Sequence, residues 1–295
     1  MSRPSRVAFL YEDDNLIAVD KPEGLPTIAP EGSRGRSLYD LVTDHIRKRN
    51  PKGRAAVVHR LDRDTSGVMI FAKNAAAKAR LMGSWNELVA QRRYVALVDG
   101  SLPQTEGILE SWLSESSPGR MKESRNQTKG SLRAVTRYRV LETGPVHSLV
   151  ELNLETGRKH QIRVQLAGAG CPVSGDSKYG SRTNPLERLC LHATVIEVEM
   201  ETGQPPLRFE SPLPPGFTRA VATRGKSTIG TAGISPKGKT GRRQDAGMGS
   251  RQDSSPTPRR AGGTGTRRGR KRGELPEARP GGRPETRPGH PKARN

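Results

Sequence analysis

The segment His59–Gly67, with the sequence HRLDRDTSG, places two arginines and two aspartates around one turn. Apolar runs precede it at 55–58 and follow it at 68–71, so the charged residues stand at the end of a strand. A guanidinium beside a carboxylate keeps that carboxylate ionised, and the same cation attracts phosphate. The pattern fits an ionised carboxylate that works near phosphate groups, although a charged turn is more commonly a solvated loop.

The charge of the chain indicates the class of partner. The formal net charge is +21 over 295 residues, which favours nucleic acid over a membrane surface. The sequence has no basic amphipathic helix with large apolar residues, and no run of about twenty apolar residues that could span a bilayer. Its first residues, MSRPSRVAFLYEDD, do not read as a secretory signal because acids interrupt the short apolar patch.

The two cysteines, Cys171 and Cys190, do not have the spacing of a metal site or a redox pair. We therefore expect two buried free thiols in a reducing cytoplasm, and no metal. The sequence also lacks a glycine-rich phosphate loop and a Ser-His-Asp arrangement, and we expect no cofactor.

Composition divides the chain near residue 220. Residues 221–295 hold 19 Lys and Arg against 5 Asp and Glu, 15 of the 33 glycines, and no Phe, Trp or Tyr. Such a segment cannot bury enough apolar surface to offset the entropy lost on ordering its backbone. We expect a folded catalytic domain at 6–220 and a disordered, basic, Arg/Gly/Pro-rich tail at 221–295.

The pattern of apolar residues predicts many strands and few helices. Two strands are expected within 7–19, and Ser37 can cap a helix whose apolar face runs from Leu38 to Ile46. We expect further strands at 68–72, 94–98, 133–141, 147–154 and 189–200, further helices at 74–92 and 161–166, and a polar excursion from the sheet at 114–130. Because strands and helices do not alternate regularly, we predict an α+β fold, with a largely antiparallel mixed sheet and flanking helices and loops.

The HRLDRDTSG string closely resembles the signature of RluA-type pseudouridine synthases, enzymes that isomerise uridine in RNA. Four more segments match motifs of this family, and all five stand in the family's order: KPEGLP at 21–26, RYVAL at 93–97, GRKHQIRVQLA at 157–167 and RLCLHA at 188–193. The resemblance covers about residues 8–217. It implies the pseudouridine synthase catalytic fold and a cofactor-free isomerase of structured RNA, either ribosomal, with the large subunit favoured, or transfer.

By this resemblance Asp62 is the catalytic aspartate, which attacks the target uridine so that the glycosidic bond breaks and the uracil rejoins through carbon. Asp64 is the competing candidate, and we expect it to orient the turn. Arg163 is the basic partner of the aspartate, because an isolated buried carboxylate would take up a proton. Tyr94 lies against the target base, where its ring suits stacking on uracil and its hydroxyl suits a part in proton transfer.

Three basic residues are expected to contact the RNA. A stacked base is not reachable, so the nucleotide must be extruded, and the resemblance implies that Arg60 fills the vacated space. Arg158 and Lys159 are candidates for phosphate contacts. The motif histidines, His59 and His160, are expected to be hydrogen-bonded structural residues and not a metal site.

A non-catalytic RNA-binding or ribosome-assembly factor that keeps the fold is the alternative function, and charge alone also permits a DNA-binding protein. The matching positions Asp62, Tyr94 and Arg163 are all intact, which favours the enzyme. We expect a cytoplasmic monomer. Its tail, with RRGRKR at 267–272, either adds salt-sensitive affinity for RNA phosphates or is only a solubilising extension.

Overall fold

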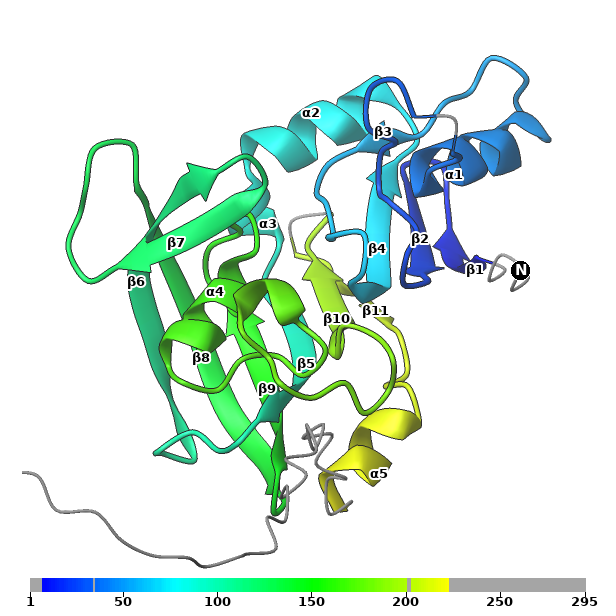
Figure 1. Ribbon diagram of the computed structural model, residues 1–295. Coiled ribbons are helices and arrows are strands. Elements are labelled where there is room, and N and C mark those ends of the chain that lie inside the picture. Colours follow the sequence, from blue (N-terminus) through cyan, green and yellow to red (C-terminus); the bar gives the residue numbers. More distant parts are fainter. Residues whose placement is uncertain (1–6, 34, 201–202, 223–295) are drawn as a thin grey trace, which may run out of the picture. The chain divides into compact units, whose positions relative to one another are not determined.

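The computed structural model describes residues 7–33, 35–200 and 203–222 (Figure 1). Its strands are β1 (Ala8–Glu12), β2 (Leu16–Lys21), β3 (Ala56–Val57), β4 (Ser66–Ala72), β5 (Gln91–Asp99), β6 (Glu106–Ser117), β7 (Arg120–Ser124), β8 (Leu132–Thr143), β9 (His147–Leu154), β10 (Leu191–Val198) and β11 (Leu207–Glu210). Its helices are α1 (Leu38–Arg47), α2 (Ala75–Gly83), α3 (Trp85–Leu88), α4 (Gln161–Gly168), α5 (Gly216–Ala222) and the 3-10 helix η1 (Ser177–Tyr179). No helix in these ranges is long and apolar enough to cross a membrane.

The strands form one sheet in the order β1-β2-β4-β10-β5-β9-β8-β6-β7, with β3 against β4 and β11 against β10. Only the β4–β10 pair among the described strands is parallel, and the other pairs are antiparallel. The predicted α+β fold with a largely antiparallel mixed sheet is therefore confirmed. The divided chain, with a disordered tail from residue 221, stays a prediction because residues 223–295 lie outside the described ranges.

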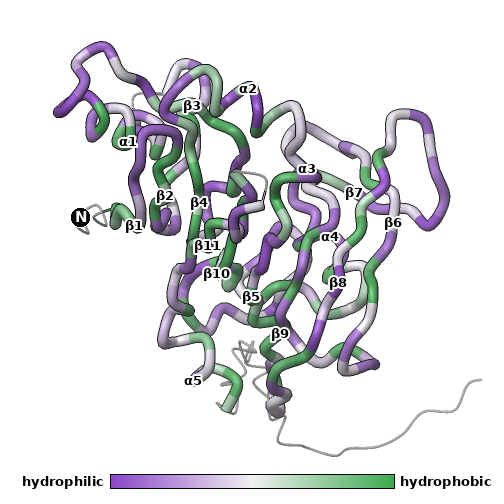
Figure 2. Tube along the Cα trace, turned by 180° about the vertical axis from the view of Figure 1, so that it is seen from behind, coloured by the Kyte–Doolittle hydropathy of each residue, from purple (hydrophilic) through white to green (hydrophobic). Residues whose placement is uncertain are grey.

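Two large apolar clusters and a small third one fill the described part of the molecule, and β10 contributes to both large clusters. The first gathers β2, β4, α1 and α2, and the second gathers β5, β9, β10, α4 and α5. All seven residues of β4 are buried, as expected of a strand covered on both faces. Figure 2 shows these hydrophobic stretches following β2, β4 and β10. The pair β4–β10 is thus the joint between the two halves of the core.

The parallel joint depends on a glycine. Ser66 and Gly67 pair with His192 and Ala193. Gly67 has a φ of 114°, and a Cβ atom there would lie 2.1 Å from the carbonyl oxygen of Ala193. Both the backbone angle and the close approach exclude a side chain. The last residue of HRLDRDTSG therefore lets the strand that follows the loop seat against β10.

Local signals placed several elements correctly. The Ser37 hydroxyl accepts a hydrogen bond from the backbone N–H of Asp40, and the Asp40 carboxylate accepts one from the Ser37 N–H, which caps α1 as predicted. The strands expected within 7–19 and at 68–72, 94–98, 133–141, 147–154 and 189–200 are also confirmed, as β1, β2, β4, β5, β8, β9 and β10, and the helix expected at 161–166 as α4.

The expected single helix over 74–92 is wrong in its second half. The chain leaves α2 after Gly83 and turns at Ser84, which has φ −127° and ψ 36°. It makes the short α3 and enters β5 at Gln91, which pairs with Glu197 of β10. Pairing in the middle of the sheet outweighs the helix propensity of this alanine-rich segment.

The expected excursion from the sheet at 114–130 is wrong for its first part. β6 continues to Ser117, turns through Gly119 with a φ of 75°, and returns as β7. Trp112 pairs with Ser124, so this polar hairpin is the edge of the same sheet. Polar residues are tolerated there because an edge hairpin is solvated (Figure 1).

Candidate active site

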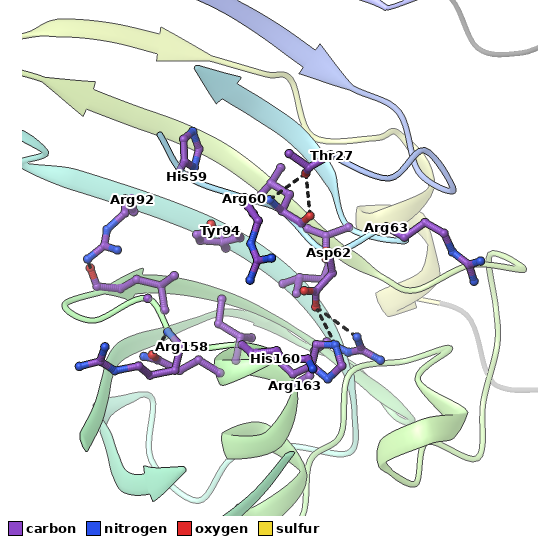
Figure 3. A pocket seen from close by; sticks show the side chains of 18 of the residues that line it. Thr27, His59, Arg60, Asp62, Arg63, Arg92, Tyr94, Arg158, His160 and Arg163 are labelled. Carbon is purple, nitrogen blue, oxygen red and sulfur yellow. Dashed lines mark hydrogen bonds and ion pairs between the residues drawn. The ribbon is translucent and has the colours of Figure 1, made fainter. Parts of the chain in front are cut away.

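The HRLDRDTSG loop joins β3 to β4, and two buried side chains anchor its backbone on either side of Asp62. The Thr27 hydroxyl donates to the Leu61 carbonyl at 2.9 Å and accepts from the Leu61 N–H at 3.3 Å. The Lys21 ammonium donates to the Arg63 carbonyl at 2.8 Å. Burial lowers the pKa of Lys21 to about 8, against the opposing charges of Asp64 and Asp62. The backbone is therefore anchored on both sides of Asp62, and Figure 3 shows the Thr27 contacts with this loop.

Asp62 meets Arg163 across the cleft. Nη1 of Arg163, on α4, donates to Oδ2 of Asp62 at 3.1 Å. The Asp62 side chain is 29% exposed, whereas that of Arg163 is 10% exposed. The carboxylate therefore remains open to a ligand, while the cation that balances it is enclosed.

A second carboxylate fixes Arg163. Asp176 accepts from Nε at 2.6 Å and from Nη2 at 2.9 Å, a fork that uses the side of the guanidinium turned away from Asp62. Burial alone would lower the pKa of Arg163, but the hydrogen bonds and charge of Asp176, joined by Asp62, raise it above its already high ordinary value. Arg163 is thus a permanent cation with only Nη1 directed at Asp62.

His160 also faces Asp62. Its Nε2 lies 3.7 Å from Oδ2 of Asp62, and its Nδ1 lies 2.7 Å from the hydroxyl of Tyr179. Burial lowers the pKa of His160; Asp62 opposes this shift and Arg163 reinforces it. The ring is therefore neutral at neutral pH. We call Asp62, His160, Arg163, Asp176 and Tyr179 the floor residues.

A cavity of about 810 Å³ opens over Asp62, a volume within the range of small-molecule sites. Tyr94, from β5, and Ile162, from α4, line it together with Asp62. Burial raises the pKa of Tyr94 to about 12; Arg92 opposes this shift and Asp62 adds to it. The phenol therefore stays protonated at neutral pH and offers the cavity a flat ring and a hydroxyl donor.

The three residues predicted to bind RNA are exposed and line the same cavity. Arg60 points into the space between the Asp62 loop and α4, and has no hydrogen bond or ion pair with the described part of the chain (Figure 3). Nε of Arg158 donates to the Arg133 carbonyl at 3.1 Å, and Lys159 pairs with Glu115 at 2.9 Å. We call Arg60, Arg158 and Lys159 the rim cations.

The other charged residue of the motif, Asp64, is placed differently. It pairs with Arg63 at 3.0 Å on the surface, and both side chains are largely exposed. Asp64 does not line the 810 Å³ cavity. His59 accepts a hydrogen bond from the Ile70 N–H at 3.0 Å and lies 5.1 Å from the Trp85 ring, a supporting contact of the predicted kind.

The structure thus brings Asp62, Tyr94 and Arg163 to one cavity and sets the rim cations around it. Sequence reasoning missed Asp176 and Tyr179, which stand in the loop DSKYG at 176–180. It also treated His160 as purely structural. The sequence offered only an Asp-x-x-Tyr pair in a segment without apolar periodicity. That pattern is too weak to predict that Asp176 contacts Arg163 or that Tyr179 contacts His160.

The family model for RNA pseudouridylate synthase matches residues 15–168. The chain is 35% identical over 210 residues to the uncharacterized RNA pseudouridine synthase YhcT of Bacillus subtilis, a match that covers 70% of this chain and 68% of that protein. It is 36% identical over 216 residues to the ribosomal large subunit pseudouridine synthase D of Nitrosomonas europaea, covering 70% of this chain and 62% of that protein.

The fold is similar to that of a solved human protein. The structure of human RNA Pseudouridylate Synthase Domain Containing 1 superposes with a TM-score of 0.58 at 27% identity. The superposition covers 72% of this chain and 86% of the human one. Three floor residues, Asp62, His160 and Arg163, lie within the range that the family model matches, whereas Asp176 and Tyr179 lie after it.

Proposed function

Because the chain belongs to the RluA-type RNA pseudouridylate synthase family, whose members are isomerases that act on RNA, we propose that it converts uridine in a structured RNA to pseudouridine, with Asp62 as the catalytic aspartate. The observation that carries this proposal is the open carboxylate of Asp62, paired with an enclosed Arg163 beneath a cavity of about 810 Å³. A carboxylate in that setting is held by an enclosed cation and still open to a nucleotide, as a nucleophile must be.

Asp62 is a better candidate than Asp64 on geometry. Asp62 lines the cavity and contacts Arg163, whereas Asp64 pairs with the exposed Arg63 and does not line that cavity. In the proposed reaction an oxygen of Asp62 forms a bond to the target nucleotide, the C1′–N1 bond breaks and the uracil turns. A C1′–C5 bond then forms, the bond to Asp62 breaks, the C5 proton is removed and N1 takes up a proton. Nothing is gained or lost overall.

Tyr94 and Arg60 are proposed to handle the extruded nucleotide. The Tyr94 ring offers a flat surface for uracil, and its hydroxyl, protonated at neutral pH, is a hydrogen-bond donor. Arg60 is exposed and points into the cavity, which suits a side chain that enters the space left in the RNA (Figure 3). Arg158 and Lys159 then serve as phosphate contacts at the edge of the same cavity.

Large-subunit ribosomal RNA is the proposed substrate, with transfer RNA as the alternative. The support is that relatives such as the one from Nitrosomonas europaea are named ribosomal large subunit pseudouridine synthase D. We also propose a cytoplasmic monomer with a catalytic domain at 6–220 and a basic tail at 221–295 that adds salt-sensitive affinity for RNA. Deletion from residue 222 onward should weaken binding at low salt and leave turnover at saturating RNA unchanged.

The test is pseudouridine formation on transcribed ribosomal and transfer RNA, with the full chain, Asp62→Asn and the matched variant Asp64→Asn. We expect product from the wild type and Asp64→Asn, and a loss of about a thousandfold or more in Asp62→Asn with RNA affinity nearly unchanged. Activity of Asp62→Asn would show that Asp62 is not the catalytic aspartate. A wild type that binds these RNAs without forming product would favour a non-catalytic RNA-binding factor instead.

A further inference from the structure

The two oxygens of the Asp62 carboxylate are treated differently. Both Nη1 of Arg163 and Nε2 of His160 approach Oδ2, at 3.1 and 3.7 Å. Oδ1 accepts no hydrogen bond from the described part of the chain. One oxygen is therefore held by the protein, and the other is left for a ligand in the cavity.

The hydrogen bond between Tyr179 and His160 determines which ring nitrogen of His160 carries the hydrogen. The Tyr179 oxygen already accepts a hydrogen bond from the Met121 N–H of β7 at 3.0 Å. Burial raises the pKa of Tyr179, so its hydroxyl keeps its proton, and the nearest acceptor for that proton is Nδ1 of His160 at 2.7 Å. A neutral imidazole that accepts at Nδ1 must carry its hydrogen at Nε2.

The opposite tautomer is unfavourable here. With hydrogen on Nδ1, the Nε2 lone pair would face the Asp62 carboxylate, and the Tyr179 hydroxyl would lose its acceptor. Two like partial charges would then stand across the 3.7 Å gap. The Tyr179 hydroxyl therefore selects the imidazole form that attracts Oδ2.

The backbone of His160 also adopts an unusual conformation. His160 has a φ of 54°, in the left-handed region that few non-glycine residues adopt. It stands at the N-cap of α4, yet its side chain makes no capping hydrogen bond and turns instead to Asp62 and Tyr179. Strain of this kind persists where surrounding contacts impose it, often at functional sites.

We infer that Tyr179, acting through His160, is a positioning residue for the reaction proposed above: it fixes the Nε2–H form of His160, which with Arg163 holds Oδ2 of Asp62 and leaves Oδ1 free to attack the nucleotide. This inference rests on the proposed function for its catalytic consequence. The hydrogen bonds from Met121 through Tyr179 to His160, and the 3.7 Å approach of His160 to Asp62, stand independently of it.

The test compares Tyr179→Phe, His160→Asn and the double variant in the full-length protein. Tyr179→Phe removes only the hydroxyl, and asparagine tolerates the left-handed backbone of position 160. We expect Tyr179→Phe to convert saturating RNA roughly tenfold more slowly with unchanged RNA affinity. Because Tyr179 acts through His160, the double variant should be no slower than His160→Asn alone. The control is Tyr11→Phe on β1. This variant loses a 2.8 Å hydrogen bond from the Tyr11 hydroxyl to Asp13 and should retain the wild-type rate.

Losses that add in the double variant would overturn the inference, as would an effect on affinity alone. The imidazole ¹⁵N resonances, assigned with His160→Asn, provide a readout that needs no activity. The wild type should show hydrogen on Nε2 of His160, and Tyr179→Phe should lose that preference. Hydrogen on Nδ1 in the wild type would reject the inference even if pseudouridine forms. Absence of product on every RNA would reject the proposed function while the resonances still decide the tautomer.

Discussion

The rim cations and three of the floor residues, Asp62, His160 and Arg163, line the same cavity, but the two groups are held in different ways. Arg163 and Asp176 are buried, and each makes at least two hydrogen bonds to other floor residues. The rim cations are exposed; Arg158 has one carbonyl and Lys159 one carboxylate as side-chain partner. The positions of the buried floor side chains are thus set by contacts within the protein, whereas the exposed rim cations can still contact phosphate. Substitutions on the floor should change stability and turnover, and those on the rim should change binding.

Removal of the central cation of the floor should have the largest effect. Arg163→Met would leave Asp62 and Asp176 without their shared partner, and the Asp176 side chain is only 1% exposed. Loss of one member of a buried ion pair costs about 3–5 kcal/mol. We expect the free energy of unfolding, measured in urea, to fall by about that amount and conversion of RNA to stop. Arg163→Lys keeps the charge and should be less destabilised; equal stability of Arg163→Met and wild type would contradict the comparison.

The second effect concerns the buried histidine at the base of the loop. His192 has its Nδ1 2.7 Å from the Ser66 hydroxyl and its Nε2 3.1 Å from that of Ser211. Burial lowers the pKa of His192 to about 4, partly offset by Asp20. The unfolded chain, with an ordinary histidine, therefore takes up this proton first as the pH falls.

The contribution of His192 to stability is consequently present above about pH 6.5 and lost as the pH falls towards 4, amounting to about 3 kcal/mol in total. We expect the difference in unfolding free energy between wild type and His192→Asn to shrink over that interval, as measured by urea unfolding at each pH. A difference that does not vary with pH would mean that the pKa of His192 is the same in the folded and the unfolded protein. The rim cations should not alter this pH dependence.

The fold and the face of the site were predictable because their signals are local. The charged turn at 59–67 between two apolar runs, and the HQIR string at 160–163, point to Asp62 and Arg163 through the family resemblance, without any knowledge of packing. The Ser37 cap and the apolar run at 68–72 in β4 are likewise signalled by neighbouring residues in the sequence.

The support behind the site was not predictable in the same way. Asp176 lies 13 residues after Arg163 and reaches it through an irregular loop, and Tyr179 meets His160 only after β7 packs nearby. The sequence predicted a helix at Gln91, but pairing with β10 places this residue in a strand, which is also a tertiary effect. Contacts that depend on how distant segments meet leave no periodic trace in the sequence.

On the rim, Arg60→Ala should have the strongest effect. Arg60 is exposed and makes no hydrogen bond or ion pair with the described residues, so the free energy of unfolding should change by less than about 0.5 kcal/mol. Because Arg60 is proposed to occupy the space left by the extruded nucleotide, we expect conversion at saturating RNA to slow by roughly tenfold. Arg54→Ala is the matched control, since Arg54 is also exposed but does not line the cavity. Equal losses in the two variants would mean that charge alone matters at position 60.

The smallest effect should come from Lys159 and the carboxylate that pairs with it. Lys159 must leave Glu115, 2.9 Å away, before it can contact an RNA phosphate. Lys159→Ala should therefore raise the Kd for RNA by about threefold and reduce the slope of log Kd against log salt concentration by about one. Glu115→Gln releases the ammonium and should lower the Kd by a similar factor, with turnover unchanged in both variants. These Kd values would be measured by fluorescence anisotropy between about 50 and 200 mM salt. Weaker binding by Glu115→Gln would show that the pair orders Lys159 for RNA instead of competing with it, and would place Lys159 with the preorganised floor.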